Sequence, residues 1–118
     1  MTHMQIEERR VGEVTVLKLR GRLVLEEGEA PLRAHIDGLI AEGRTEIVLN
    51  LHDVNYIDSS GVGSIAAKFL SVRRRGGDLK LVDLSDRCHH VLDITGLLPI
   101  LMPVRTEAEA LRSFVVKA

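Results

Sequence analysis

Residues 47–51, with the sequence IVLNL, form an almost unbroken apolar run near the middle of this 118-residue chain. Short apolar runs of this kind are typical of β-strands that are covered on both faces, as in parallel sheets flanked by helices. A strand of this type predicts an α/β architecture, because each face of its sheet needs another layer to bury it.

Amphipathic helices are predicted on both sides of this strand. The helix before it ends at Gly43, and its apolar face is formed by Leu32, Ile36, Leu39 and Ile40. The helix after it starts near Val62, and its apolar face is formed by Ile65, Ala66, Phe69 and Leu70. Residues 73–75 (RRR), followed by two glycines, close the second helix, since cations and then glycine favour a helix C-terminus.

The residues nearest the N-terminus predict a β-hairpin. Residues 5–11 and 14–19 have the β-branched and partly alternating composition of strands, and a Gly-Glu pair at 12–13 supplies the tight turn between them. Gly21 is expected to end the second strand. The hairpin makes the first two strands antiparallel.

After the second helix, strands and helices continue to alternate. Residues 79–82 (LKLV) predict a strand, and residues 86–95 predict a short helix. Ser85 or Asp86 is the expected N-cap of that helix, and Gly96 is expected to end it.

The last part of the chain predicts one more strand and one more helix. Residues 98–104 are expected to form a short edge strand, where Pro99 and Pro103 are tolerable. Thr106 and Glu109 make a capping-box pattern. The helix that it opens is expected to run through Ala108, Leu111 and Val115.

Together these elements predict a single α/β domain that spans residues 1–118. Its mixed β-sheet begins with the antiparallel hairpin, and its later strands are parallel through right-handed crossovers. About four helices are expected to pack against the sheet.

Composition excludes several classes of function. The chain has 45% apolar and 28% charged residues, which is ordinary for a soluble globular protein, and its net charge is −1. This balance offers no electrostatic attraction for nucleic acid or for an anionic membrane surface. The single cysteine, Cys88, suits a reducing compartment, and no apolar run is long enough to span a bilayer. We therefore expect a cytoplasmic protein with no direct membrane contact and no nucleic-acid partner.

Residues 56–63, with the sequence YIDSSGVG, link the apolar strand to the second helix and are the main functional candidate. The first N–H groups of a helix lack intrahelical partners, and the helix dipole favours negative charge there. A phosphate on a serine at this point would find free donors, and Gly61 and Gly63 would leave the backbone open to a partner. On the residues alone, ordinary helix caps formed by the aspartate and serines before the helix, Asp58 and Ser59 among them, are the simpler interpretation.

The segment resembles the motif of the STAS domain family (sulfate transporter and anti-sigma factor antagonist). Its single-domain bacterial members typically carry Asp-Ser-Ser-Gly-Leu-Gly or Asp-Ser-Ala-Gly-Leu-Gly. The resemblance covers almost the whole chain, because further family features follow in order: residues 21–23 (GRL), 47–51 (IVLNL), 76–77 (GG), 79–82 (LKLV) and 92–97 (LDITGL). It implies a STAS-like mixed sheet, in agreement with the α/β fold predicted above.

The resemblance implies a partner-switching cycle. The unphosphorylated antagonist binds an anti-sigma factor that is also a serine/threonine kinase, and the sigma factor is released. The kinase then phosphorylates the antagonist, which dissociates until a phosphatase resets it. The family position of the phosphoserine is the serine before the glycine, here Ser60. The implied partner-binding residues are Asp58, Ser59, Gly61, Val62, Gly63, Leu23 and Val24.

One position departs from the family pattern. Members commonly have an acidic residue after the early Gly-x-Leu, where this chain has Val24. Since this region is expected to lie near the kinase, the difference implies a divergent kinase or a different output. The resemblance implies a regulator that is the substrate of an enzyme rather than an enzyme, and no cofactor.

Other interpretations have less support in the sequence. The main alternative is a phosphorylation-independent STAS adaptor, such as a subunit of a membrane transport complex. A small nucleotide-binding domain is a more distant one, since Gly61 and Gly63 lie too far from the first strand for a dinucleotide fingerprint. Cys88 and the two histidines after it lack a second ligand pair, so we expect no metal site.

Overall fold

The computed structural model describes residues 4–25 and 27–115, and for Val115 it describes the backbone alone. Along the chain, the elements are β1 (Gln5–Val11), β2 (Val14–Leu23), α1 (Glu29–Ala41), β3 (Glu46–Ile57), α2 (Ser59–Arg74), β4 (Asp78–Val82), α3 (Asp86–Ile94), α4 (Leu98–Leu101) and α5 (Glu107–Val115). The sheet has the order β1-β2-β3-β4. The hairpin pair is antiparallel and the other two pairs are parallel, so the predicted mixed α/β sheet is confirmed.

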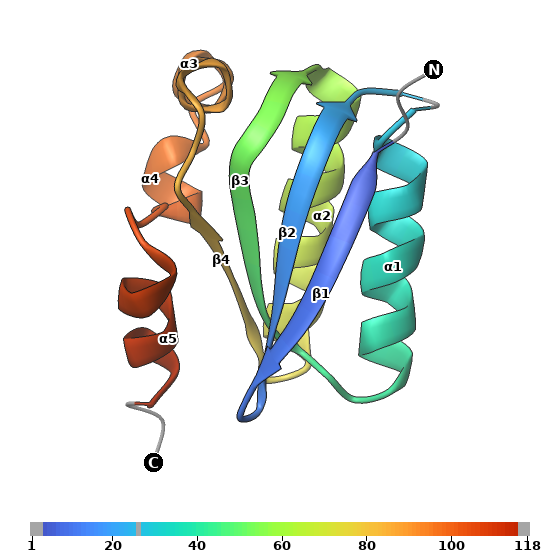
Figure 1. The fold of residues 1–118 in the computed structure, drawn as a ribbon, viewed down its shortest axis with the longest axis vertical. Helices are drawn as coiled ribbons and strands as arrows, with labels where there is room; N and C mark the ends of the chain where they lie inside the picture. Colours follow the sequence, from blue (N-terminus) through green and yellow to red (C-terminus); the bar gives the residue numbers. More distant parts are fainter. Residues whose placement is uncertain (1–3, 26, 116–118) are drawn as a thin grey trace.

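Helices cover both faces of the sheet (Figure 1). The helices α1 and α2 pack on one face, over alternate residues of β3 such as Ile47 and Leu49. The helix α5 packs on the other face, over a smaller cluster formed by Val14, Val16, Val48, Val82, Ala110 and Phe114. All five residues of the run 47–51 are buried, as a strand covered on both faces requires.

The one polar residue of that run, Asn50, is accommodated by two hydrogen bonds. Its side-chain amide donates to Glu107 Oε2 at 2.9 Å, and its Oδ1 accepts the His52 amide at 2.9 Å. Burial opposes the charge on Glu107, but hydrogen bonds from Arg9 and Asn50 outweigh it and hold the pKa of that carboxyl below its usual range. Asn50 therefore fixes α5 on the sheet rather than forming a site.

Two strands run further than predicted. The strand β2 does not end at Gly21 but continues to Leu23, and its register with β3 shifts around Gly21, where φ is +122°. The strand β3 continues to Ile57, and α2 begins at Ser59 rather than near Val62. Residues 52–57 include several polar side chains, but their pairing with β2 keeps them in the strand. Asp58 is consequently the single residue between the end of β3 and the start of α2, so the candidate functional segment contains almost no loop.

The predicted edge strand at residues 98–104 is wrong. Residues Leu98–Leu101 form the short helix α4, because Pro99 suits a first helical turn and Leu101 is buried in the main core. Only a single bridge, between Val104 and Val82, remains of the expected pairing. The described residues thus contain five helices rather than about four.

Two helix faces also differ from the prediction. In α2 the buried apolar side chains are Val62, Ile65, Phe69 and Val72, whereas Leu70 is 51% exposed. In α5 the packed face contains Ala110 and Phe114, whereas Ala108 is exposed and the Val115 side chain lies outside the described residues. The expected cap of α5 is present, since Thr106 Oγ1 accepts the Glu109 amide at 3.1 Å.

The two apolar positions of α2 should therefore differ in their effect on stability. Ile65→Ala is expected to lower the free energy of unfolding by about 2–5 kcal/mol, because it empties a fully buried position. Leu70→Ala is expected to change it by no more than about 0.5 kcal/mol. Urea titration followed by circular dichroism measures both, and equal losses would contradict the placement of α2.

Candidate functional site

Asp58 is the N-cap of α2 and joins two chain segments. Its Oδ1 accepts the Gly61 amide at 3.0 Å, which satisfies a donor in the first turn of the helix. Its Oδ2 accepts the Leu25 amide at 3.2 Å, in the segment between β2 and α1. The Asp58 amide in turn donates to the Leu23 carbonyl at 3.4 Å. Of the cap candidates, Asp58 is the one that caps the helix, and it also holds the ends of β2 and β3 together.

The two glycines of the segment have different environments. A Cβ at Gly61 would lie 2.2 Å from the Leu23 carbonyl oxygen, so the β2 backbone fills the space beside it. The expectation that Gly61 leaves the backbone open to a partner is therefore wrong, and no cradle for a nucleotide phosphate exists there. At Gly63, which is exposed, a Cβ would meet nothing within 4 Å.

The two serines lie in the first turn of α2. Ser59 is exposed and Ser60 is half-buried. The first turn bond of the helix runs from the Val62 amide to the Asp58 carbonyl at 3.0 Å, so the serine amides precede it. Within residues 4–25 and 27–115, the Ser60 hydroxyl makes no hydrogen bond. Its oxygen can be reached from solvent, because none of the buried side-chain oxygens of these residues lacks a hydrogen-bond partner.

The other predicted site residues lie beneath the surface. Leu23, Val24 and Val62 are 0%, 9% and 4% exposed, so they support the site from below. Leu25, which the sequence analysis did not single out, is 60% exposed beside the capped segment. The surface around Ser60 thus includes Leu25, Ser59 and Gly63.

A polar stripe on α2 faces α1 and begins at Ser60. Ser60, Ser64 and Lys68 follow at intervals of four residues, which places them on one helix face about 5–6 Å apart. Ser64 Oγ donates to Glu29 Oε1 at 2.7 Å, and Lys68 Nζ donates to Asp37 Oδ1 at 2.6 Å.

Glu29 therefore contacts α2 one helical turn beyond Ser60. The hydrogen bonds from Ser64 and then from Arg33 hold the pKa of Glu29 below its usual range, although the nearby charge of Asp58 opposes this. Glu29 was missed by the sequence analysis, because only the packing of α1 on α2 brings it to this place. Asp58 is bonded to Gly61 in the first turn of α2 and Glu29 to Ser64 in the second, so both carboxylates lie near the turn that carries Ser60.

The remaining sequence candidates do not assemble into a site. Cys88 is fully buried, and burial raises the pKa of its thiol, while His89 and His90 are exposed. In the part of the chain that the structure describes, no three histidine, cysteine or acidic residues are grouped to hold a metal. No helix of that part is both long enough and apolar enough to cross a bilayer.

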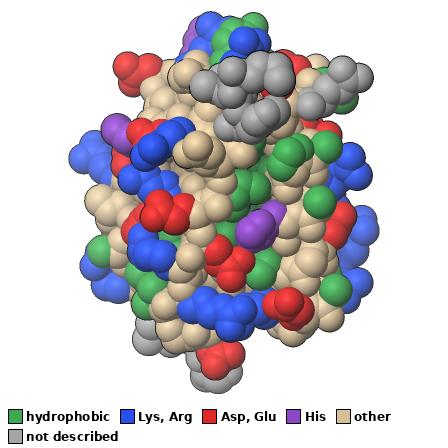
Figure 2. Space-filling view, turned by 45° about the vertical axis from the view of Figure 1, so that its right-hand side comes forward, with side chains coloured by type: hydrophobic (Ala, Val, Ile, Leu, Met, Phe, Trp, Pro, Cys, Tyr) green, Lys and Arg blue, Asp and Glu red, His purple; other side chains and the backbone are tan. Residues whose placement is uncertain are grey.

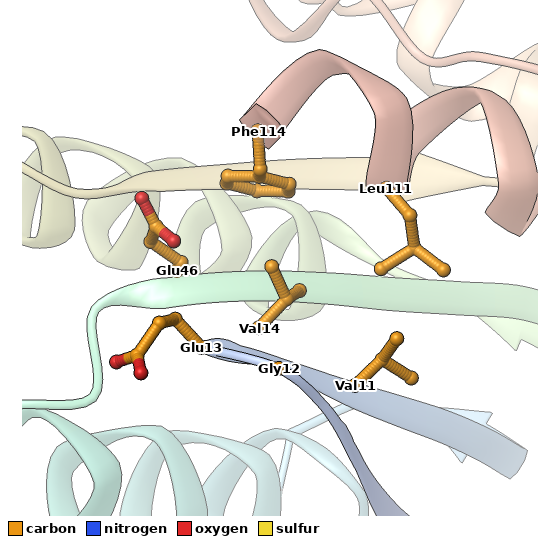
Figure 3. A pocket seen from close by; sticks show the side chains of 7 residues that line it. All are labelled: Val11, Gly12, Glu13, Val14, Glu46, Leu111 and Phe114. Carbon is orange, nitrogen blue, oxygen red and sulfur yellow. The ribbon is translucent and has the colours of Figure 1, made fainter. Parts of the chain in front are cut away.

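A groove of about 480 Å³ lies away from this site (Figure 3). It is lined by Val11, Gly12, Glu13, Val14, Glu46, Leu111 and Phe114. Val14 and Glu46 are the first residues of β2 and β3, so the groove is at the opposite end of these strands from Asp58. Figure 2 shows acidic and basic side chains interspersed on the α1 side, with no field of one sign.

Comparisons with known proteins agree with the fold and place the chain among regulators. The model of the STAS domain matches residues 5–110. The anti-sigma F factor antagonist of Paenibacillus polymyxa is 30% identical over 115 residues, 97% of each chain. A Thermotoga maritima protein of known structure has a TM-score of 0.85 at 28% identity, covering 92% of each chain. The Bacillus cell fate determinant SpoIIAA in its phosphorylated form has a TM-score of 0.73 at 28% identity, covering 93% of this chain and 99% of that one.

The two glycines provide a matched pair for testing the geometry. Gly61→Ala is expected to cost about 1–3 kcal/mol of folding free energy, since the Leu23 backbone cannot move aside cheaply. Gly63→Ala is expected to be neutral or to stabilise by up to about 1 kcal/mol, because alanine is the better helix former. Thermal and urea unfolding measure both changes. A Gly61→Ala variant as stable as Gly63→Ala would contradict the contact with Leu23.

Proposed function

The chain belongs to the STAS domain family, and we propose that it is an anti-sigma factor antagonist that is switched by phosphorylation of Ser60. In its unphosphorylated form it binds an anti-sigma factor that is also a serine kinase, and a phosphatase resets the phosphorylated form. It acts in the cytoplasm as a regulator and kinase substrate rather than as an enzyme. The observation that carries the proposal is the accessible Ser60 hydroxyl in the first turn of α2, which makes no hydrogen bond to any residue that the structure describes.

The surroundings of Ser60 explain why an added phosphate would act as a switch. Phosphorylation adds about −1.5 to −2 charges, in a helical turn that lies near the carboxylates of Asp58 and Glu29. Asp58 is held by two backbone amides and Glu29 by Ser64 and Arg33, so neither carboxylate is free to move away. A partner that covers this point would have to desolvate three negative groups together.

The fold itself should tolerate the modification. The phosphate would stand at a helix N-terminus, where the dipole and the amides of the first turn favour negative charge. Phosphorylation therefore changes the charge of the surface without requiring α2 to unfold.

The partner-binding residues fall into two groups. Ser59 and Gly63, together with Leu25, are exposed and would contact the kinase directly. Leu23, Val24, Gly61 and Val62 would act by supporting this surface. Val24 is uncharged and buried, so the position after the early Gly-x-Leu offers the partner no charge here, and the exposed Leu25 offers an apolar side chain instead.

Substitutions at the two serines test the switch. Ser60→Ala should abolish phosphate transfer and keep kinase binding, whereas Ser60→Asp should weaken binding at least tenfold, within the usual range of allosteric coupling. Ser59→Ala, the control, should still be phosphorylated at Ser60. The measurements are co-purification of the kinase with and without ATP, mass mapping of the phosphate, and titration calorimetry.

Two results would overturn this proposal. The first is transfer of phosphate to another residue, and the second is binding of Ser60→Asp as tight as that of wild type. The second result, together with co-purification of a membrane protein instead of a kinase, would favour the phosphorylation-independent adaptor of a transport complex.

The role of Glu29 is testable by a double-mutant cycle. In a Glu29→Gln background, Ser60→Asp should weaken kinase binding by about two- to fivefold less than in wild type, because one of the two nearby negative charges is gone. Asp37→Asn is the matched control, since Asp37 pairs with Lys68 two turns further along α2. Equal effects of Ser60→Asp in all three backgrounds would exclude repulsion by Glu29.

A further inference from the structure

A tyrosine and two arginines form a cluster beside the candidate switch. Tyr56, the next-to-last residue of β3, is 40% exposed. The Arg22 guanidinium of β2 lies over its ring at 5.2 Å from the centroid, and the Arg87 guanidinium of α3 lies over it at 4.3 Å. Both distances are within the range of cation–π attraction. Arg22, Tyr56 and Arg87 are called the Tyr56 cluster below.

The cluster carries one positive charge that is not neutralised by an ion pair. Arg22 Nε lies 3.3 Å from Glu27 Oε2. Arg87 is exposed, and among the described residues it takes part in no ion pair. Its contact with the Tyr56 ring therefore orients a guanidinium that makes no hydrogen bond to the described residues.

The base of the cluster is rigid. Ser85 caps α3 by accepting the Cys88 amide at 3.2 Å, and its hydroxyl donates to the Val54 carbonyl of β3 at 2.8 Å. Cys88 and Leu92 of α3 are fully buried in the main core. The side chain of Arg87 thus projects from a helix that is fastened to the same strand as Tyr56.

The cluster lies at the same end of the molecule as Ser60. Tyr56 precedes the Asp58 cap by two residues, and Arg22 precedes Leu23, whose carbonyl accepts the Asp58 amide. Figure 1 shows α3, the ends of β2 and β3 and the start of α2 together at one end. The polar stripe that begins at Ser60 faces α1, whereas the Tyr56 cluster includes Arg87 of α3. The two features therefore lie on either side of the end of β3.

We propose that the Tyr56 cluster is a second contact surface for the anti-sigma factor kinase, on which Arg87 donates hydrogen bonds to a carboxylate of the kinase. The inference rests on the proposed function and names the chemistry of its partner surface. Tyrosine and arginine dominate the binding energy of many protein interfaces, and a guanidinium matches a carboxylate in geometry. A pre-oriented arginine also loses less side-chain freedom on binding.

A charge-reversal pair tests this surface. Arg87→Glu should weaken binding of the unphosphorylated chain to the ATP-loaded kinase at least tenfold and reduce its dependence on salt concentration. The substitution should not unfold α3, because a carboxylate in the first turn of a helix is favourable. Arg74→Glu makes the same charge change at the exposed end of α2 and should alter the affinity by less than twofold.

The ring of Tyr56 can be used to detect kinase binding directly. The chain contains one tyrosine and no tryptophan, so 3-fluorotyrosine labelling gives a single ¹⁹F resonance, from Tyr56. This resonance should shift or broaden when the kinase is added. Ser60→Asp should suppress the change at concentrations where wild type binds.

The outcomes separate this surface from the switch. Loss of affinity in Ser60→Asp with none in Arg87→Glu, or equal loss in Arg87→Glu and Arg74→Glu, would overturn the Tyr56 cluster alone. An unchanged ¹⁹F resonance in a saturated complex would do the same. Failure of the wild-type chain to bind the kinase would overturn the proposed function and the cluster with it.

Discussion

The carboxylate of Asp58 is the interaction on which the functional end of the molecule depends. It accepts amides from Gly61 and from Leu25, 33 residues earlier in the chain. In a parallel sheet the strand ends that lead into helices meet at one edge, and here a single side chain joins two of them. The Leu25 segment and the first turn of α2, which carries Ser60, therefore keep fixed positions relative to one another.

Much of the fold could be predicted because its signals are local. The hairpin, the buried strand at residues 47–51 and the Thr106 cap depend on neighbouring residues alone. The extension of β3 to Ile57 could not be predicted in this way, since pairing with β2 outweighs the polar residues within it. The helix α4 was missed because Pro99 suits an edge strand and a first helical turn equally well.

The candidate site was predictable only in part, for a related reason. Asp58 and Ser60 are adjacent to a helix start that the sequence reveals. Glu29 and Arg87 reach the site through tertiary packing. Gly61 belongs to the motif for a structural reason. The Leu23 carbonyl leaves no room for a side chain there, so this glycine is evidence for the fold and not for a phosphorylation switch. What distinguishes a switch is the hydroxyl and the charges around it.

The burial of Cys88 has a practical consequence for work on this protein. It is the only thiol in the chain, it has no exposed surface, and burial raises its pKa, so alkylating reagents should reach it slowly in the native state. A cysteine introduced at an exposed position then becomes a selective attachment point for a spectroscopic label. The rate at which Cys88 itself is modified then reports how often α3 opens away from the sheet.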